Sequence, residues 1–147
     1  MDIATTILNA AKIAKVSGVL LLGICSHESG NFKLNFAPMD KGSPSFGSCQ
    51  LKHATAKFLG FKGDPKELMN PEINAKYAAL YLQYQQTRYG EDWVALTAAY
   101  NAGSFFPNKS HPQCPKNLGY VQSVQKHLPD DFKYRLDCGN TQIAGNP

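Results

Sequence analysis

The sequence predicts a mainly helical single domain with one polar loop that holds at most a small β-hairpin. The chain has 147 residues, 43% of them hydrophobic, which suits one buried core and is short for two. Apolar residues recur at helical spacing in several segments that begin at capping residues and end at glycines. Gly, Pro, Ser, Asn and Asp concentrate between residues 31 and 50. We therefore treat residues 1–147 as one domain.

The first third of the chain predicts two helices followed by the polar loop. Ile3–Val16 places its apolar residues on one face, as an amphipathic helix does. Ser17 is expected to cap a second helix that runs through Val19–Glu28 and ends at Gly30. Residues 33–50 then form a loop or a short hairpin.

The middle third predicts two short helical segments and one long helix. Leu51–Leu59 is expected to be a short helix, and Asp64–Glu67 has the sequence of a capping box with proline at the first helical position. Asn70–Glu72 repeats that start signal before a helix that Gly90 ends. Six residues of this helix fall on one face: Ile73, Tyr77, Leu80, Tyr81, Tyr84 and Arg88.

The last third predicts two further helices and a tail. Asp92 is expected to cap Trp93–Tyr100, and Asn101–Gly103 stops that helix. A last helix is marked by Tyr120, Val121, Val124 and Leu128. Residues 129–147 are expected to be a C-terminal tail.

The charge and the apolar runs argue against two kinds of partner. The formal net charge of +4 suits an anionic polymer such as a cell wall, but the basic residues are scattered and form no basic arm, so we expect no nucleic-acid binding. The longest apolar run, Val19–Cys25, is too short to span a bilayer and is expected to be a buried helix rather than an export signal. We therefore expect no stable membrane insertion.

The four cysteines allow up to two disulfides. Cys114 and Cys138 lie in the irregular C-terminal third, where a disulfide would order the chain. Cys25 and Cys49 lie in apolar surroundings and are expected to be reduced, buried thiols. Zinc ligation would draw on His111, Cys114, His127 and Cys138. Their spacing matches no standard zinc motif, so we expect no metal site.

Glu28 is the first candidate for catalysis. It closes an apolar helix immediately before a Ser-Gly-Asn break, so its carboxyl is expected where the core meets the loop. Partial burial raises the pKa of a carboxyl, and a protonated carboxyl can act as a general acid. The alternative is an ordinary solvated glutamate at a helix end.

Two further segments carry groups that bind sugars. The loop Ser43–Leu51 ends in the amide of Gln50, and Ala98–Gly103 places the phenol of Tyr100 and the amide of Asn101 at a helix end. Amides and phenols hydrogen-bond to sugar hydroxyl and acetamido groups, and aromatic rings stack on sugar rings. The alternative for Tyr100 is a core aromatic residue at a helix end.

Four segments resemble the motifs of lytic transglycosylases of the soluble-lytic-transglycosylase (SLT) type. Glu28–Phe32 resembles the Glu-Ser motif and Gly47–Leu51 is similar to the Gly-Leu-Met-Gln segment. Ala99–Gly103 resembles the Ala-Tyr-Asn-x-Gly motif, and Tyr120-Val121 resembles the late Tyr-Val. The matches follow the family's order over a motif core of about residues 18–128. Ser48-Cys49 departs from the usual Leu-Met.

This resemblance implies a lysozyme-like fold and cleavage of peptidoglycan glycan strands. The family breaks the β-1,4 bond between N-acetylmuramic acid and N-acetylglucosamine without water and leaves a 1,6-anhydro ring. Carried over to this chain, Glu28 would act first as the acid and then as the base. No cofactor is implied, and a monomer is expected.

The resemblance also assigns roles in substrate binding. Gln50 would hydrogen-bond to the glycan near the scissile bond, and Tyr100 would orient Glu28 and the substrate. Asn101 would shape its turn, Tyr120 would face the same cleft, and Ser45 would touch the muramyl substituents.

Three other functions compete with this reading. A goose-type lysozyme would use water, which an inverting hydrolase positions with a second carboxylate about 6.5–9.5 Å from the acid. Asp40 is the candidate for that carboxylate. A cysteine peptidase built on Cys25 is disfavoured, because that residue lies late in its helix without a His–Asn or His–Asp pair. A non-catalytic wall-binding protein would not need Glu28. The expected setting is a phage enzyme, held in the host cytoplasm before release to the wall or carried in the virion.

Overall fold

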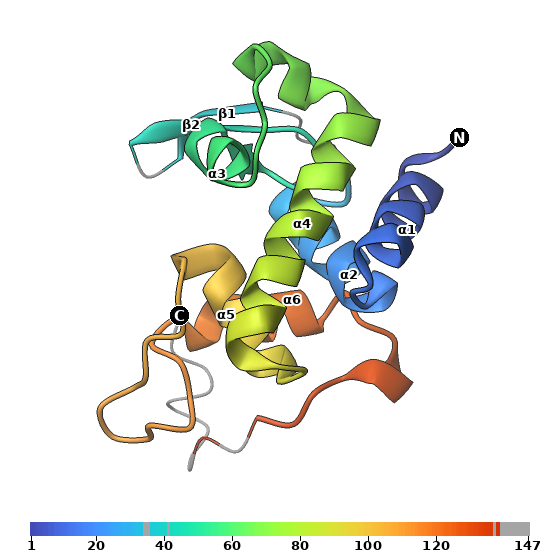
Figure 1. Cartoon of the computed structure of the whole chain (residues 1–147). Helices are drawn as coiled ribbons and strands as arrows, with labels where there is room; N and C mark the ends of the chain where they lie inside the picture. Colours follow the sequence, from blue (N-terminus) through green and yellow to red (C-terminus); the bar gives the residue numbers. More distant parts are fainter. Residues whose placement is uncertain (34–35, 41, 137, 139–147) are drawn as a thin grey trace. The chain divides into compact units, whose positions relative to one another are not determined.

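The computed structural model describes the chain except for residues 34–35, 41, 137 and 139–147 and the side chains of residues 39 and 40. It is mainly helical with one small three-stranded sheet, which confirms the predicted fold class (Figure 1). The chain divides into two compact units, Met1–Tyr84 and Gln85–Pro147. The boundary between them falls within the long helix α4 (Pro71–Tyr89), and each unit is described separately below.

The first unit begins with a pair of packed helices, α1 (Ile3–Ala14) and α2 (Gly18–Glu28). Ser17 caps α2 as predicted, since its hydroxyl accepts a hydrogen bond of 3.1 Å from the backbone N–H of Leu20. Gly18 lies where the two helices meet. A Cβ atom at that position would lie 2.8 Å from the end of the Leu8 side chain, which would have to shift.

A small antiparallel sheet follows, with the strands β1 (Phe36–Asp40), β2 (Ser43–Phe46) and β3 (Leu51–Lys52) in that order. The hairpin is thus confirmed, but the predicted helix Leu51–Leu59 is shorter than expected. Its first two residues form β3, because the turn after Phe46 returns the chain alongside β2 and pairs Phe46 with Leu51. The helix α3 therefore begins two residues later and spans His53–Phe58.

The capping box at Asp64 introduces the short 3₁₀ helix η1 (Pro65–Met69), and α4 follows it. The apolar and aromatic stripe predicted on α4 is only half-buried, and Arg88 at its end is exposed. The fully buried residues of α4 lie on another face: Asn74, Ala75, Ala78, Ala79, Leu82 and Gln85. Small residues permit close packing around this helix, and the two buried amides bind backbone groups described below.

The second unit contains α5 (Trp93–Ala102) and α6 (Leu118–Gln125), which pack against each other. The carboxylate of Asp92 caps α5 as predicted, accepting a hydrogen bond of 3.1 Å from the N–H of Ala95. The segment after α6 includes the 3₁₀ helix η2 (Asp130–Phe132).

Part of the expected tail is fastened to α6. The Tyr134 hydroxyl donates a hydrogen bond to the carbonyl of Val121, and the Gln125 amide donates one of 2.9 Å to the carbonyl of Tyr134. Cys138 is bonded to Cys114. The predicted tail residues 139–147 lie outside the described residues.

Two disulfides are present, one expected and one not. Cys114–Cys138 confirms the predicted bridge and uses both sulfurs that a zinc site would have needed. Cys25–Cys49 shows that the prediction of reduced thiols was wrong. Both cysteines are fully buried, but burial does not tell a thiol from a disulfide, because free cysteines are buried as well. Among the described residues, no cluster of three or more His, Cys, Asp or Glu side chains could hold a metal ion.

Within the described part of the chain, no helix combines the length and the hydropathy that a bilayer crossing requires.

The buried phenol of Tyr134 predicts a loss of stability at high pH. Burial raises the pKa of this phenol well above its ordinary value, and interaction with the Thr97 hydroxyl offsets only part of the effect. The folded protein therefore holds the phenolic proton more tightly than the unfolded chain. This contribution to the free energy of unfolding is complete below about pH 10 and is lost as the pH rises further.

We predict that Tyr134→Phe lowers the free energy of unfolding at pH 7 by about 1 kcal/mol, because a hydrogen bond is removed. The variant should also lose less stability than the wild type between about pH 10 and pH 11.5. Urea unfolding of both proteins across this range measures the difference. Parallel pH profiles would contradict the assignment.

Candidate active site

Glu28 is the last residue of α2, and its side chain is half-buried. It follows Cys25 by three residues, which places both side chains on the same side of the helix. Ser29 fixes the chain directly after it. Its buried hydroxyl donates a hydrogen bond of 2.8 Å to the carbonyl of Cys25 and accepts one of 2.9 Å from the N–H of Phe32. The end of α2 is therefore tied down on both sides of Glu28.

The turn beyond Ser29 is left-handed at three successive residues. Gly30, Asn31 and Phe32 have φ values of 58°, 61° and 67°. A residue with a side chain loses about 1–2 kcal/mol in this region. The N–H of Asn31 offsets part of that cost by donating a hydrogen bond of 2.8 Å to the carbonyl of Ser26. This sharp turn ends the helix at the catalytic candidate.

Gln50 ends a second tight turn, which joins β2 to β3. Gly47 and Gln50 both have positive φ, 77° and 51°. The backbone N–H and the side-chain amide of Gln50 both donate to the carbonyl of Gly47, at 3.1 and 2.8 Å. Gln50 is 9% exposed, and the hydrogen bond to Gly47 holds its side chain against the turn.

Asn74 on α4 holds the Gln50 turn in place. Its carbonyl oxygen accepts a hydrogen bond of 2.9 Å from the N–H of Cys49, and its amide donates to the carbonyls of Phe46 and Leu68 at 2.7 and 2.9 Å. A Cβ atom on Gly47 would lie 2.3 Å from the Asn74 amide nitrogen, so only glycine fits there. Sequence reasoning missed Asn74. The available signal was an asparagine between the apolar residues Ile73 and Ala75 of a helix.

The Cys25–Cys49 disulfide connects the two turns. The Cα atoms of the cysteines are 4.2 Å apart. Glu28 lies one helical turn after Cys25, and Gln50 directly follows Cys49. Their Cα atoms are therefore no more than about 13 Å apart. The first unit thus brings together Glu28 and Gln50, which are distant in the sequence.

The other two candidates of the first unit lie in the hairpin. Ser45 is fully buried in β2, opposite Ala37 of β1 and Lys52 of β3. Its contact with muramyl substituents stays a prediction. Asp40 pairs with Ser43 through the backbone, and its side chain lies outside the described residues.

In the second unit, Tyr100 and Asn101 lie in the last turn of α5. Tyr100 is 7% exposed and Asn101 is half-buried. Two side chains of α4 bind the carbonyl of Gly103, which caps α5. Gln85 donates to it at 3.0 Å and Arg88 at 2.7 Å. Neither contact was foreseen from the sequence, in which Gln85 stands among other polar residues, although it is fully buried.

Asn117 joins the Asn101 turn to the start of α6. Its amide donates to the side-chain oxygen of Asn101 at 2.9 Å and to the carbonyl of Ala98 at 3.1 Å. Tyr120 lies one turn further along α6 and is half-buried. The second unit therefore places Tyr100 and Asn101 on α5 and Tyr120 on α6. The side-chain amide of Asn117 connects the two helices.

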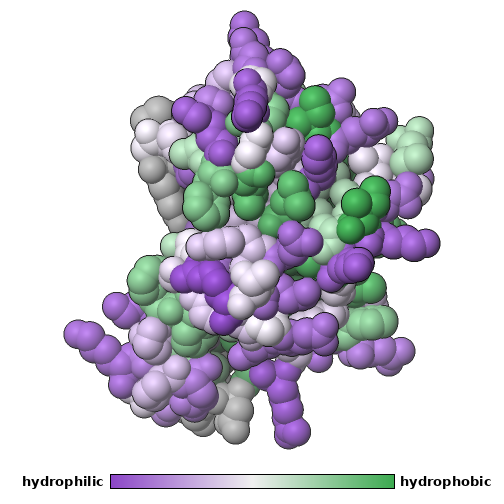
Figure 2. All heavy atoms as spheres, viewed as in Figure 1, coloured by the Kyte–Doolittle hydropathy of each residue, from purple (hydrophilic) through white to green (hydrophobic). Residues whose placement is uncertain are grey.

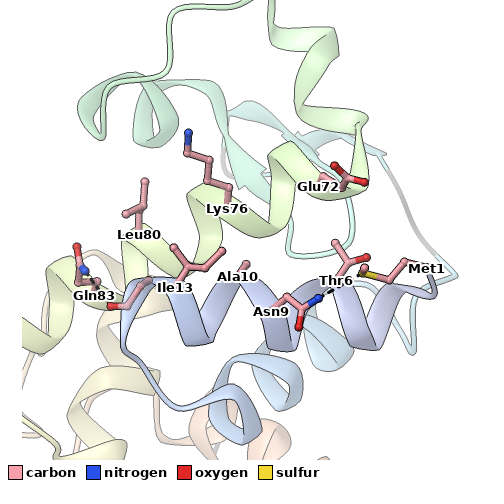
Figure 3. Close-up of a pocket in the computed structure, with 10 residues that line it drawn as sticks. Met1, Thr6, Asn9, Ala10, Ile13, Glu72, Lys76, Leu80 and Gln83 are labelled. Atoms are coloured by element: carbon pink, nitrogen blue, oxygen red, sulfur yellow. Dashed lines mark hydrogen bonds between the residues drawn. The ribbon is translucent and has the colours of Figure 1, made fainter.

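A groove of about 460 Å³ lies between α1 and α4, lined by residues such as Ala10, Ile13, Lys76 and Leu80 (Figure 3). Apolar side chains reach the surface over these two helices (Figure 2), and Ile13 is 83% exposed. None of the motif residues lines this groove. It is therefore separate from the candidate catalytic groups.

The family assignment rests on the match over residues 5–117 to the sequence model of the transglycosylase SLT domain. The chain belongs to this family. The match covers most of the chain and includes Glu28, Gln50, Tyr100 and Asn101, whereas Tyr120 lies beyond it. The role of Tyr120 as part of the SLT domain therefore rests on the Tyr-Val resemblance alone.

The fold of this SLT domain is also similar to a solved structure. The X-ray structure of an inactive mutant of lytic transglycosylase Slt from Pseudomonas aeruginosa aligns with a TM-score of 0.59 and 19% identity. The alignment covers 90% of this chain and 26% of the Slt chain, so the present chain corresponds to about a quarter of that protein. A comparison with curated proteins found no match.

We predict that Asn74→Ala lowers the free energy of unfolding by roughly 3 kcal/mol or more, because buried backbone groups lose their partners. The Gln50 turn should loosen as well. Asn9→Ala is the matched control, since Asn9 is an exposed asparagine in α1 and should change stability by no more than about 0.5 kcal/mol. Chemical unfolding of the three proteins measures both values. Equal stability of the two variants would contradict the role given to Asn74.

Proposed function

We propose that the protein is a peptidoglycan lytic transglycosylase. It cleaves the β-1,4 bond between N-acetylmuramic acid and N-acetylglucosamine and leaves 1,6-anhydro-muramyl ends. The observation that carries this proposal is the placement of Glu28. Its carboxyl ends a buried helix, in a fixed turn that a disulfide connects to the Gln50 turn, inside the matched SLT domain.

In the first step, protonated Glu28 gives its proton to the glycosidic oxygen. The bond between that oxygen and C1 of the muramyl sugar breaks, and its electron pair leaves with the N-acetylglucosamine. Positive charge develops at C1. A half-buried carboxyl at a helix end, with a hydrogen-bonded turn beside it, is held in one place for this transfer.

In the second step, the Glu28 carboxylate takes the proton from the C6 hydroxyl of the same muramyl sugar. The C6 oxygen bonds to C1 and closes the anhydro ring, so no water is consumed. Glu28 is protonated again and ready for the next cycle. One carboxyl thus serves both steps, and the reaction needs no second catalytic carboxylate.

The remaining candidates bind the glycan in this proposal. Gln50 hydrogen-bonds to the sugar near the scissile bond, and Tyr100 and Tyr120 supply phenol groups and ring faces. Asn101 shapes the turn after Tyr100, which Asn117 supports. Ser45 is fully buried in β2, and in this proposal it supports the part of the hairpin that lies next to the muramyl substituents.

The similar structure supports a mechanism with one catalytic glutamate. It is the structure of an inactive mutant of a lytic transglycosylase in which a glutamate is replaced by glutamine. Loss of activity on replacing one carboxyl by an amide fits a mechanism that depends on a single acid.

We also propose that the protein acts as a monomer on cell-wall glycan outside the cytoplasm. It would arrive there by release from a phage-infected cell or as part of the virion. The two disulfides support this setting, because disulfides persist in oxidising compartments such as the periplasm and are rare in the cytoplasm.

We predict that Glu28→Gln lowers the rate of muropeptide release by roughly 10³-fold or more, because it removes the acid and the base together. Glu72→Gln is the control, since Glu72 is exposed at the start of α4 and should leave the rate unchanged. The measurement is mass spectrometry of soluble products from purified peptidoglycan. Products one water lighter that resist borohydride reduction establish the anhydro ring.

Other products would contradict parts of the proposal. Reducible muramic acid ends would make the protein a hydrolase and direct attention to Asp40. Reducible N-acetylglucosamine ends would mean that the wrong bond was assigned. Equal activity of Glu28→Gln and the wild type would rule out Glu28 as the catalytic acid.

A further inference from the structure

We propose that the Cys25–Cys49 disulfide is a positioning element for catalysis, so that full activity requires its oxidised form. The inference rests on the proposed function, because it assumes that Glu28 is the acid and that Gln50 binds the glycan. The disulfide connects the two turns that position the candidate groups. One is the helix turn that carries Glu28, and the other is the backbone turn that carries Gln50.

The side-chain hydrogen bonds that hold the Gln50 turn connect it to itself and to α4. Asn74 fixes it to α4, and through its bond to the carbonyl of Leu68 it also fixes the end of η1. The disulfide adds a covalent connection to α2. Since Cys25 and Glu28 lie on the same side of that helix, movement of the Cys49 segment relative to α2 changes the distance from Gln50 to the carboxyl.

Catalysis is more sensitive to such a movement than stability is. A displacement of 1 Å in a catalytic group can reduce the rate by about 10²-fold. We therefore expect kcat to fall roughly 10- to 100-fold when the disulfide is opened, while the hydrogen bonds of Asn74 keep the turn folded. The loss should appear in kcat, because Gln50 then no longer holds the scissile bond in line with the Glu28 carboxyl.

The second disulfide provides a matched control. Cys114–Cys138 spans the same sequence separation, 24 residues, as Cys25–Cys49. In the chain-entropy account the two therefore restrict the unfolded chain equally. Cys114–Cys138 instead ties the last described residues to the segment before α6. Removing it should lower stability by a similar amount and leave kcat within about twofold of the wild type.

The first experiment compares Cys25→Ser/Cys49→Ser with Cys114→Ser/Cys138→Ser. The unfolding free energy, kcat and KM are measured for the folded protein, using release of anhydro-muropeptides. A third variant, Cys25→Ala/Cys49→Met, refills the buried space with apolar atoms but restores no bond. We expect low kcat in both variants that lack Cys25–Cys49. Recovery of kcat in the Ala/Met variant would overturn the proposal, because packing alone would then suffice.

The second experiment opens the bond without mutating it. In Cys114→Ser/Cys138→Ser protein, dithiothreitol passes two electrons and two protons to the remaining disulfide, which gives two cysteine thiols and the cyclic disulfide of the reagent. Alkylation and mass spectrometry count the thiols, and circular dichroism follows the fold. Activity should fall with reduction and return on reoxidation. Unchanged activity in fully reduced, folded protein would overturn the proposal even if the serine variants do not fold.

The two proposals fail in different ways. If Glu28→Gln is as active as the wild type, the proposed function is wrong. If Glu28 is required but opening Cys25–Cys49 leaves kcat unchanged, only the role of the disulfide is wrong.

Discussion

Backbone groups that are shut off from water need partners, and at the Gly47–Gln50 turn Asn74 supplies them. One side-chain amide binds the N–H of Cys49 and the carbonyls of Phe46 and Leu68, which come from two segments of the chain. Because the amide has both a donor and an acceptor end, no apolar side chain could replace it. This turn positions Gln50 and lets β2 pair with β3. It also brings Cys49 close enough to Cys25 for a disulfide.

In the second unit, polar side chains likewise bind the groups at the end of α5. Gln85 and Arg88 bind the carbonyl of Gly103, and Asn117 binds both the side chain of Asn101 and the backbone before it. In each unit, motif residues lie on a turn, while residues outside the motifs hold that turn through hydrogen bonds. Hydrogen bonds from side chains outside the motifs thus hold the turns that carry the motif residues.

The caps and stop signals of the helices could be predicted from sequence, because Ser17 and Asp92 act on residues three positions away. Glu28 could also be predicted, since the helix end is visible in the sequence. Long-range polar contacts could not. Asn74 binds Phe46 across 28 positions, and nothing local shows that this amide faces inward. The Cys25–Cys49 bond was missed for the same reason, because pairing depends on a meeting of two distant turns.

The departure from the family's Gly-Leu-Met-Gln segment follows from how the turn is held. Asn74 binds backbone atoms of this segment, and Gly47 is required because its neighbour leaves no room for a Cβ atom. The side chains at Ser48 and Cys49 take no part in those bonds, so the turn can keep its shape while they vary. In this chain Cys49 forms a disulfide with Cys25, which lies in the same helix as Glu28. Cys49 thereby connects the Gln50 turn to the helix turn that carries Glu28.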